Sequence, residues 1–266
     1  MTPEEIESAA QMLFDAEKSG IQCGLLSLAY PHMTLDDAYA VQAALVGRKR
    51  ASGLQPIGWK IGLTSRAMQQ ALNITTPDSG ILFDNMLFES GATVPAGRFI
   101  QPRIEAEIAF IMKAPLKGED VTRQDVIAAT GHVAPSLEIL DTRILRADPA
   151  TGKARIITDT VSDNAANAGI VLGNERHAVD RFDLRWTGAI LKRDGVVEET
   201  GLGAGVLDDP VTGIVWLVKR LARYGGGLAS GDIVLSGSFI RPVEAPSGSS
   251  FDADFGEFGS VSLRFG

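Results

Sequence analysis

Cysteine and histidine are scarce in this 266-residue sequence, and neither stands in a spacing typical of catalysis or metal binding. Cys23 is the one cysteine, so no disulfide can form within the chain, and a reducing compartment fits this composition. The histidines stand far apart, without the H-x-x-x-H spacing of a metal-ligand pair. We therefore interpret all three as structural, namely His32, His132 and His177.

Long apolar runs and basic stretches are missing as well. No segment approaches the roughly 20 consecutive apolar residues that span a bilayer. The amino terminus has neither the basic region nor the apolar run of a signal peptide. The formal net charge is −8, from 33 acidic and 25 basic residues, which disfavours nucleic acid as a partner. We therefore expect a cytoplasmic protein that binds neither membranes nor nucleic acid, although an anionic substrate remains compatible with a bound metal ion.

Helical patterns are concentrated at the start of the chain. Thr2 and Glu5 form a capping-box pattern ahead of apolar residues at helical spacing, and Gly20 marks the expected end of this helix. Thr34 is the expected cap of a second helix that runs to about Arg50.

Strand-like segments dominate the rest of the sequence. This order, helices first and strands afterwards, predicts an α+β fold and not alternating βαβ units. We expect one domain over 1–266, in which a helical part at 1–54 packs on a β-rich body at 55–266. Within the body we predict a strand at 57–62, a short helix at 65–72, a loop at 75–80, helices at 122–130 and 211–224, and a hairpin turn at 193–195.

The most informative segment is the apolar run from Arg103 to Met112. As a strand, it places Glu105 and Glu107 on one face, about 7 Å apart at their Cα atoms. Two carboxylates on a buried face need a cation or raised pKa values, and hard oxygen ligands select Mg²⁺, Mn²⁺ or Ca²⁺. An isolated pair of this kind is more commonly the solvated face of an edge strand, so the rest of the sequence has to decide.

Two charges in other apolar segments favour a metal site. Glu138 is the one charged residue within 133–140, and an isolated charge in a core strand is costly. Lys60 lies in the equally apolar segment 57–62. Lys60 is either a structural lysine whose ammonium reaches solvent, or a cation that stabilises negative charge developing near a metal.

Two polar segments allow a structural and a functional interpretation. Asp78 lies in a Pro-Asp-Ser-Gly sequence, where the ordinary role is that of a turn residue. The segment from Ser162 to Gly169 is small, polar and ends in glycine. It forms either a helix cap with a turn or a backbone cradle for a carboxylate, and its residues leave both open.

Together these segments resemble the 2-oxopent-4-enoate hydratase and 4-oxalocrotonate decarboxylase family, within the fumarylacetoacetase-like superfamily. The resemblance covers essentially the whole chain. It is carried, in this order, by Gly58–Ser65, Pro77–Gly80, Pro102–Glu107, Leu137–Glu138, Ser162–Gly169 and Gly231–Gly237. The subgroup that acts on 2-oxohept-4-ene-1,7-dioate is the most similar, through Glu198–Gly201, Gly205–Leu207 and Gly237–Pro242.

The resemblance implies a fold and a metal centre. The fold is a mixed β-roll like the carboxy-terminal domain of fumarylacetoacetase, with the amino-terminal helices packed on it. The metal is Mg²⁺, with Mn²⁺ as the alternative, and its ligands fall on Glu105, Glu107 and Glu138. A lysine and an aspartate at the site fall on Lys60 and Asp78. No histidine lies near these two in the sequence, which disfavours the C–C hydrolases of the superfamily.

The implied activity is the addition of water to a small 2-oxo-enoic acid, by a chain that forms a homo-oligomer such as a ring-like decamer. A bound metal would polarise the 2-oxo group, Lys60 would support the enolate charge, and Asp78 is the leading candidate for proton transfer. Ser162 and Arg103 are expected to contact the substrate. The partner of a second, distal carboxylate is unranked among Arg66, Arg103, Arg143 and Arg241.

Three alternatives share the same residues. A 2-oxopent-4-enoate hydratase or a 4-oxalocrotonate decarboxylase would use the same metal and the same enolate. A non-catalytic partner subunit is disfavoured, because a scaffold has no reason to keep buried unpaired charge. A metal-stabilised structural β domain would lose stability in EDTA but would have no activity to lose.

Overall fold

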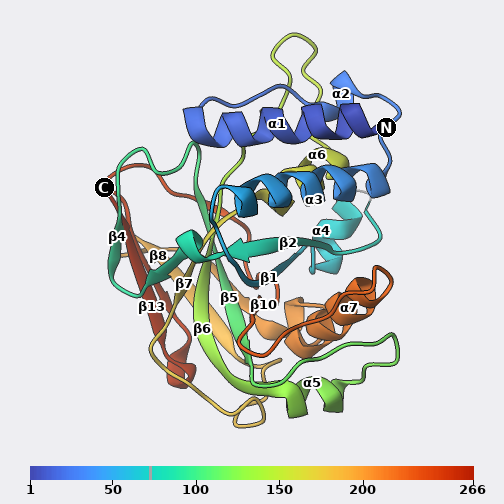
Figure 1. Ribbon diagram of the computed structural model, residues 1–266. Helices are drawn as coiled ribbons and strands as arrows, with labels where there is room; N and C mark the ends of the chain where they lie inside the picture. Colours follow the sequence, from blue (N-terminus) through green and yellow to red (C-terminus); the bar gives the residue numbers. More distant parts are fainter. Residues whose placement is uncertain (72–73) are drawn as a thin grey trace.

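The structure, a computed structural model, describes residues 1–71 and 74–266 and combines helices with two mixed sheets, as predicted (Figure 1). The helices are α1 (Pro3–Ser19), α2 (Leu26–Ala29), α3 (Leu35–Ala51), α4 (Arg66–Ala71), α5 (Arg123–Ala129), α6 (Ile157–Ser162) and α7 (Pro210–Ala222). The strands are β1 (Pro56–Gly62), β2 (Asp78–Phe83), β3 (Leu87–Glu89), β4 (Ala92–Val94), β5 (Arg103–Met112), β6 (Thr130–Leu140), β7 (Asn167–Leu172), β8 (Gly188–Arg193), β9 (Val196–Leu202), β10 (Ile233–Leu235), β11 (Val243–Glu244), β12 (Ser250–Asp254) and β13 (Ser260–Phe265).

Reciprocal caps fix the start of the predicted amino-terminal helices. The hydroxyl of Thr2 accepts the backbone N–H of Glu5, whose carboxylate accepts the N–H of Thr2. Thr34 and Asp37 repeat this capping box at the start of α3. Each box satisfies donors that the first helical turn would otherwise leave unpaired. Both predicted helices are confirmed.

Two sheets form the β-rich body. The larger one is ordered β2-β1-β10-β5-β6-β7-β3, with β11 also paired to β5, and the smaller one is ordered β4-β13-β12-β8-β9. Most neighbours are antiparallel, but β1 with β10, β3 with β7, and β4 with β13 run parallel. The predicted hairpin joins β8 to β9 through Asp194 and Gly195, both with positive φ, as a tight two-residue turn requires.

Alternation along β5 separates a core face from a polar face. Ile104, Ile108 and Phe110 are fully buried against residues of the smaller sheet, including Phe251 and Leu263. Each such side chain contributes roughly 1.5–3 kcal/mol of burial free energy. The alternate residues of β5, among them the two glutamates, therefore point to the opposite face of the larger sheet.

The amino-terminal helices lie across one end of this larger sheet (Figure 1). Val46 of α3 packs with Phe83 at the end of β2 and with Met86, which follows that strand. The buried Gln42 amide donates to the carbonyls of Ser79 and Val161, both at 2.9 Å. The helices thus close over β2 and α6, which brings them next to the polar face. No described helix is long and apolar enough to cross a membrane.

The structure corrects one local prediction. Asp78, Ser79 and Gly80 were expected in a loop, but they begin β2, where Asp78 pairs with Gly62 and Gly80 pairs with Lys60. The pairing is between segments that lie 16 to 20 residues apart, so the local turn pattern could not reveal it. The predicted helix at 65–72 is present as α4, and its expected end at Leu72 lies outside the described residues.

Candidate active site

Three carboxylates meet on the polar face of the larger sheet. Glu105 and Glu107 come from β5, and Glu138 of β6 lies directly opposite Glu105 in the antiparallel register. One carboxylate oxygen from each of the three lies within 4.8 Å of the other two. The strand register thus gathers residues that are 33 positions apart in the sequence, as expected from their placement in apolar strands.

These carboxylates are held in an environment that disfavours their charges. Glu107 and Glu138 are buried, with exposed fractions of 1% and 0%, whereas Glu105 is partly exposed. Burial, followed by the negative charge of Glu138, raises the pKa of Glu105 to about 8. The same two causes hold the pKa of Glu107 well above its ordinary range. Because these negative charges lie so close together, a bound proton or cation is needed to relieve their repulsion.

Lys60 and Asp78 complete the polar cluster from β1 and β2, which lie beyond β10 in the same sheet. The Nζ atom of Lys60 lies 3.4 Å from Oε1 of Glu138, and both side chains are buried. Burial lowers the pKa of Lys60, but the charges of Glu138 and Asp78 outweigh it and leave that pKa raised. Lys60 therefore remains an ammonium ion inside the protein.

Asp78 sits against the backbone of Gly62. Burial raises its pKa, and the charge of Lys60 and the N–H of Gly62 only partly offset this. A Cβ atom at Gly62 would lie 2.2 Å from Oδ1 of Asp78 and 2.8 Å from Nζ of Lys60. Only glycine leaves room for the two side chains at this position. Oδ1 of Asp78 is buried and has no hydrogen-bond partner.

Fixed donors orient the buried glutamates. The amide of Asn167 donates to Oε1 of Glu138 at 3.0 Å, so this oxygen is shared between Asn167 and Lys60. Oε2 of Glu138 is buried without a partner. The backbone N–H of Gly237 donates to Oε2 of Glu107 at 2.8 Å. Glu107 and Glu138 are thus each held through one carboxylate oxygen. The second oxygen of Glu138 remains without a hydrogen bond.

A buried ion pair supports Asn167 from behind. Arg143 donates to the carboxylate of Asp163 at 2.5 Å and to the carbonyl of Asn167 at 3.2 Å. Between them, Asn164, Ala165 and Ala166 all have φ between +51° and +56°. The side chain of Asn164 holds this strained turn by bonding both the N–H and the C=O of Ile81. The segment 162–169 is therefore a helix end followed by a turn. The side-chain amide of Asn167 in this segment, and not a backbone amide, contacts Glu138 of the cluster.

The donor set fits a hard divalent cation. Four carboxylates, Glu105, Glu107, Glu138 and Asp78, share the site with one ammonium, that of Lys60. Mg²⁺ and Mn²⁺ prefer such oxygen ligands. Oε2 of Glu138 accepts no hydrogen bond, so this oxygen is available to bind a metal ion. Within the described residues, the three glutamates are the group of His, Cys, Asp or Glu side chains close enough to hold a metal ion together.

The remaining residues expected at the site have their own partners outside this cluster. The hydroxyl of Ser162 donates to the carbonyl of Thr158 within α6. Arg103 forms an ion pair with Glu244 at 2.9 Å. Of the other candidates for a distal carboxylate, Arg143 is fully engaged with Asp163, and two are paired at the surface, Arg66 with Asp208 and Arg241 with Glu199.

Two contacts were not foreseen in the sequence. Asn167 was included in a motif without a role, and the N–H of Gly237 is a backbone donor that no side-chain pattern can indicate. Gly237 has φ +121°, and a Cβ there would lie 2.3 Å from Oγ1 of Thr64. The presence of glycine at position 237 was the one sign in the sequence that another part of the chain approaches the backbone closely there.

Comparison with known proteins gives full-length similarity. The chain is 49% identical over 256 residues to 2-oxo-hept-4-ene-1,7-dioate hydratase of Escherichia coli, covering 96% of both chains. It is 38% identical over 265 residues to 2-keto-4-pentenoate hydratase of Paraburkholderia xenovorans strain LB400, covering 100% of this chain and 96% of the relative. The chain belongs to the hydratase and 4-oxalocrotonate decarboxylase family. No protein-family model matches it.

A solved structure of a family member confirms the fold. The 4-oxalocrotonate decarboxylase of Pseudomonas putida G7, complexed with magnesium and adipate, superimposes with a TM-score of 0.93 at 32% identity. The match covers 100% of this chain and 98% of that one. The predicted α+β roll with packed amino-terminal helices is therefore the family fold.

Proposed function

We propose that this chain is a Mg²⁺-dependent hydro-lyase that adds water to 2-oxohept-4-ene-1,7-dioate and forms 4-hydroxy-2-oxoheptanedioate, a step of aromatic meta-cleavage catabolism in the homoprotocatechuate branch. One observation carries the proposal: full-length identity of 49% to a hydratase of that substrate, in a chain whose Glu105, Glu107 and Glu138 converge within 4.8 Å. Mn²⁺ is the alternative metal. We also propose a homo-oligomer, which mass measurement by light scattering tests.

The three glutamates would hold the cation, which would act as a Lewis acid on the 2-oxo group and as a template for its carboxylate. Asn167 and Gly237 keep two of the glutamates oriented without using all their oxygens. The buried ammonium of Lys60 is placed to balance negative charge that develops on the substrate's 2-oxygen. Because its partners keep it protonated, Lys60 acts through its charge and does not transfer a proton.

Asp78 is the proposed group for proton transfer. Its raised pKa and partnerless Oδ1 suit a carboxyl that exchanges a proton with a substrate carbon. In the dienol form of the substrate, that proton goes to C5, and the 2-hydroxyl loses its proton as the 2-oxo group forms. Water then adds its hydroxyl to C4, which conjugation with the 2-oxo group makes electrophilic, and C3 takes up a proton as the resulting enolate returns to the ketone. Relative to the 2-oxo-4-enoate, the net change is one hydrogen at C5 and one hydroxyl at C4.

The first experiment follows the ultraviolet absorbance of the conjugated substrate with Mg²⁺ and then with EDTA. We expect Mg²⁺-dependent loss of absorbance and a product heavier by one water. Turnover that persists undiminished after complete metal removal would contradict a metal-dependent hydratase.

A second candidate is decarboxylation of 4-oxalocrotonate, favoured by the TM-score of 0.93 to a 4-oxalocrotonate decarboxylase. The two reactions share the 2-oxo head and differ at the distal end. Release of carbon dioxide from 4-oxalocrotonate, without hydration of the seven-carbon dioate, would assign the chain to the decarboxylase. A five-carbon substrate, 2-oxopent-4-enoate, is the third candidate and is tested by the same absorbance assay.

A further inference from the structure

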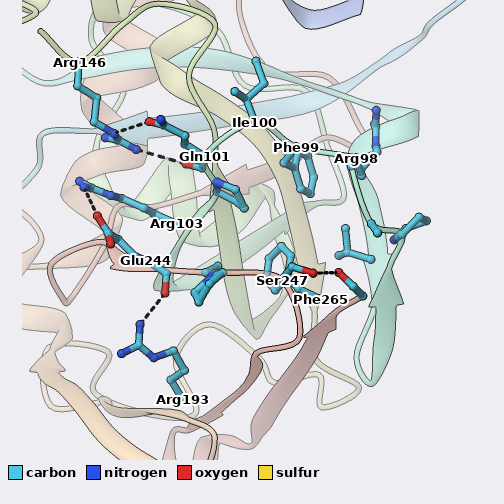
Figure 2. A pocket seen from close by; sticks show the side chains of 18 residues that line it. Arg98, Phe99, Ile100, Gln101, Arg103, Arg146, Arg193, Glu244, Ser247 and Phe265 are labelled. Atoms are coloured by element: carbon cyan, nitrogen blue, oxygen red, sulfur yellow. Dashed lines mark hydrogen bonds and ion pairs between the residues drawn. The ribbon is translucent and has the colours of Figure 1, made fainter. Parts of the chain in front are cut away.

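A cavity of about 520 Å³ lies at the end of the roll where β5 begins. Figure 2 shows the side chains of Arg146, Arg103 and Arg193 along one side of it, with Phe99 and Phe265 across the cavity. Glu244 is the one acidic residue of its lining. The cavity therefore sets arginines opposite two aromatic rings, with Arg98 beside Phe99, and this combination suits a carbon chain that ends in a carboxylate.

A hairpin over 146–155 adds a further cation beside this wall. The backbone N–H of Arg155 donates to the carbonyl of Arg146 at 2.9 Å, and Ala147 pairs with Ala154. The guanidinium of Arg155 donates to the hydroxyl of Thr142. The hairpin thus fixes Arg146 and Arg155 as neighbours.

Neither of these two arginines has a carboxylate partner among the described residues. Arg146 reaches only the side chain and carbonyl oxygens of Gln101, both at 3.3 Å, as Figure 2 shows. Burial and the charges of Arg103 and Arg155 lower the pKa of Arg146 to about 10. Arg103 pairs with Glu244, yet its Nε is buried without an acceptor. The charges of the three guanidinium groups therefore act on one another, and within the described part of the chain Arg103 alone among them forms an ion pair, with Glu244.

The cluster adjoins the candidate active site. Arg103 alternates with the core residues of β5 and so shares a face with Glu105 and Glu107, about 7 Å along the strand from Glu105. On the other side, Arg155 lies near enough to Asp78 for its positive charge to oppose the rise in the pKa of Asp78 that burial causes. An extended seven-carbon chain spans about 7–8 Å between its end carbons. This length is similar to the spacing of Arg103 and Glu105 along β5, so a substrate whose head is at the glutamates would extend toward the arginines.

We propose that Arg146 and Arg155, together with Arg103, bind the distal carboxylate of a dicarboxylic substrate. The inference rests on the proposed hydratase function and deepens it, because the cluster would select dioates over monoacids with the same 2-oxo-enoate head. Guanidinium groups bind carboxylates through paired, charge-assisted hydrogen bonds. The other arginines near the site are engaged elsewhere: Arg143 with Asp163, and Arg220 stacked at 3.6 Å on the ring of Tyr39.

The test compares two substrates in the variants Arg146→Gln and Arg155→Gln. For the seven-carbon dioate we expect KM to rise about tenfold or more in each variant, since a charge-assisted hydrogen bond is lost. For five-carbon 2-oxopent-4-enoate, which has no distal carboxylate, kcat and KM should stay within about twofold of the wild-type values. Arg176→Gln, an exposed arginine outside the cluster, is the charge-matched control and should change neither substrate.

Equal effects on both substrates, or none on either, would overturn the inference. Circular dichroism and Mg²⁺ titration of each variant separate a lost contact from lost folding, and the two single variants guard against one failing to fold. Calorimetry with unreactive adipate and hexanoate gives a second readout that does not need turnover. If the wild type hydrates neither substrate, the proposed function fails, but calorimetry still tests whether the arginines bind a distal carboxylate. Loss of the preference for adipate over hexanoate in the variants would support that role, and an unchanged preference would refute it.

Discussion

At the scale of single residues, the two oxygens of Glu138 have different surroundings. Oε1 receives Asn167 and faces Lys60, whereas Oε2 is buried without a partner. A buried acceptor without a donor costs about 1–3 kcal/mol. A bound ligand would remove this cost by pairing with the oxygen. Oε2 of Glu138 therefore marks the side of the cluster where a ligand is expected.

Asn167→Leu removes the donor while keeping the side-chain volume similar. We expect Mg²⁺ affinity to fall about tenfold or more, because residues that orient metal ligands typically contribute 10- to 100-fold to affinity. Calorimetric titration measures the effect. Ser136→Ala, which removes a hydroxyl bonded only to the backbone carbonyl of Glu107, is the control. A folded Asn167→Leu protein with wild-type affinity would show that Glu138 needs no such support.

Asp78→Asn tests the proton-transfer role. The amide is isosteric but carries no exchangeable carboxyl proton, so kcat should fall by roughly 10²–10⁴ while Mg²⁺ affinity changes little. Steady-state kinetics together with metal titration give both quantities. Full activity in this variant would remove Asp78 from the mechanism.

Metal binding should depend on pH through the glutamates. The pKa of Glu105 in the metal-free protein is raised to about 8, and the metal ligand is the carboxylate. Mg²⁺ binding should therefore release protons and strengthen as pH rises from 6 to 8.

The corresponding effect on stability has a definite sign. A carboxyl whose pKa is raised on folding stabilises the metal-free protein fully below its unfolded pKa, and this contribution is lost as pH rises through about 8. The increase in Tm that Mg²⁺ produces should thus be larger at pH 8 than at pH 6. Thermal scans with Mg²⁺ and with EDTA measure it, and an increase independent of pH would contradict the assignment.

At the scale of elements, local chemistry predicted the capped helices, missed the short helices α2 and α6, and failed where strands pair over a distance. Capping boxes at Thr2, Thr34 and Thr122 mark helix starts within four residues, so their sequence signals suffice. Asp78 carries a turn-like sequence, but pairing with β1 makes it part of a strand. The left-handed turn at 164–166 contains no glycine, and only its tertiary contacts reveal it.

Gly62→Ala tests how closely β1 approaches its site residues. The added methyl group would lie 2.2 Å from Oδ1 of Asp78, so one of the two must move. We expect kcat to fall at least tenfold in a protein that still folds. Gly47→Ala is the matched control: this exposed glycine inside α3 has open space around it. It should leave kcat unchanged and raise the free energy of unfolding by about 0.5–1 kcal/mol. Similar activities of the two variants would contradict the close approach.

At the scale of the whole molecule, the order of helices and strands predicted an α+β fold, and the family resemblance implied the β-roll and the ligand set of Glu105, Glu107 and Glu138. The apolar strands that carry these glutamates favoured the same metal site. The cationic cluster was only partly predictable. Arg103 was named among four unranked arginines, whereas Arg146 and Arg155 were absent from that set. They reach it through a hairpin whose pairing carries no strong local signal.

The amino-terminal helices are predicted to be inseparable from the β-rich body. Removing residues 1–54 would expose Phe83 and Met86 and would leave the carbonyl of Ser79 without its Gln42 donor. We therefore expect the fragment 55–266 to lack a cooperative thermal transition, measured by circular dichroism. A fragment that unfolds cooperatively like the full chain would show two independent units.

The register that sets Glu105 opposite Glu138 also bears on how the chain reaches this fold. Like charges in directly opposed positions oppose the very pairing that the apolar face of β5 favours. A slip of one residue would relieve them, but it would turn the apolar side chains of β5 to the wrong face. The two pressures conflict until a proton or a cation neutralises the carboxylates, so neutralisation of this cluster favours the correct strand alignment before any substrate is met.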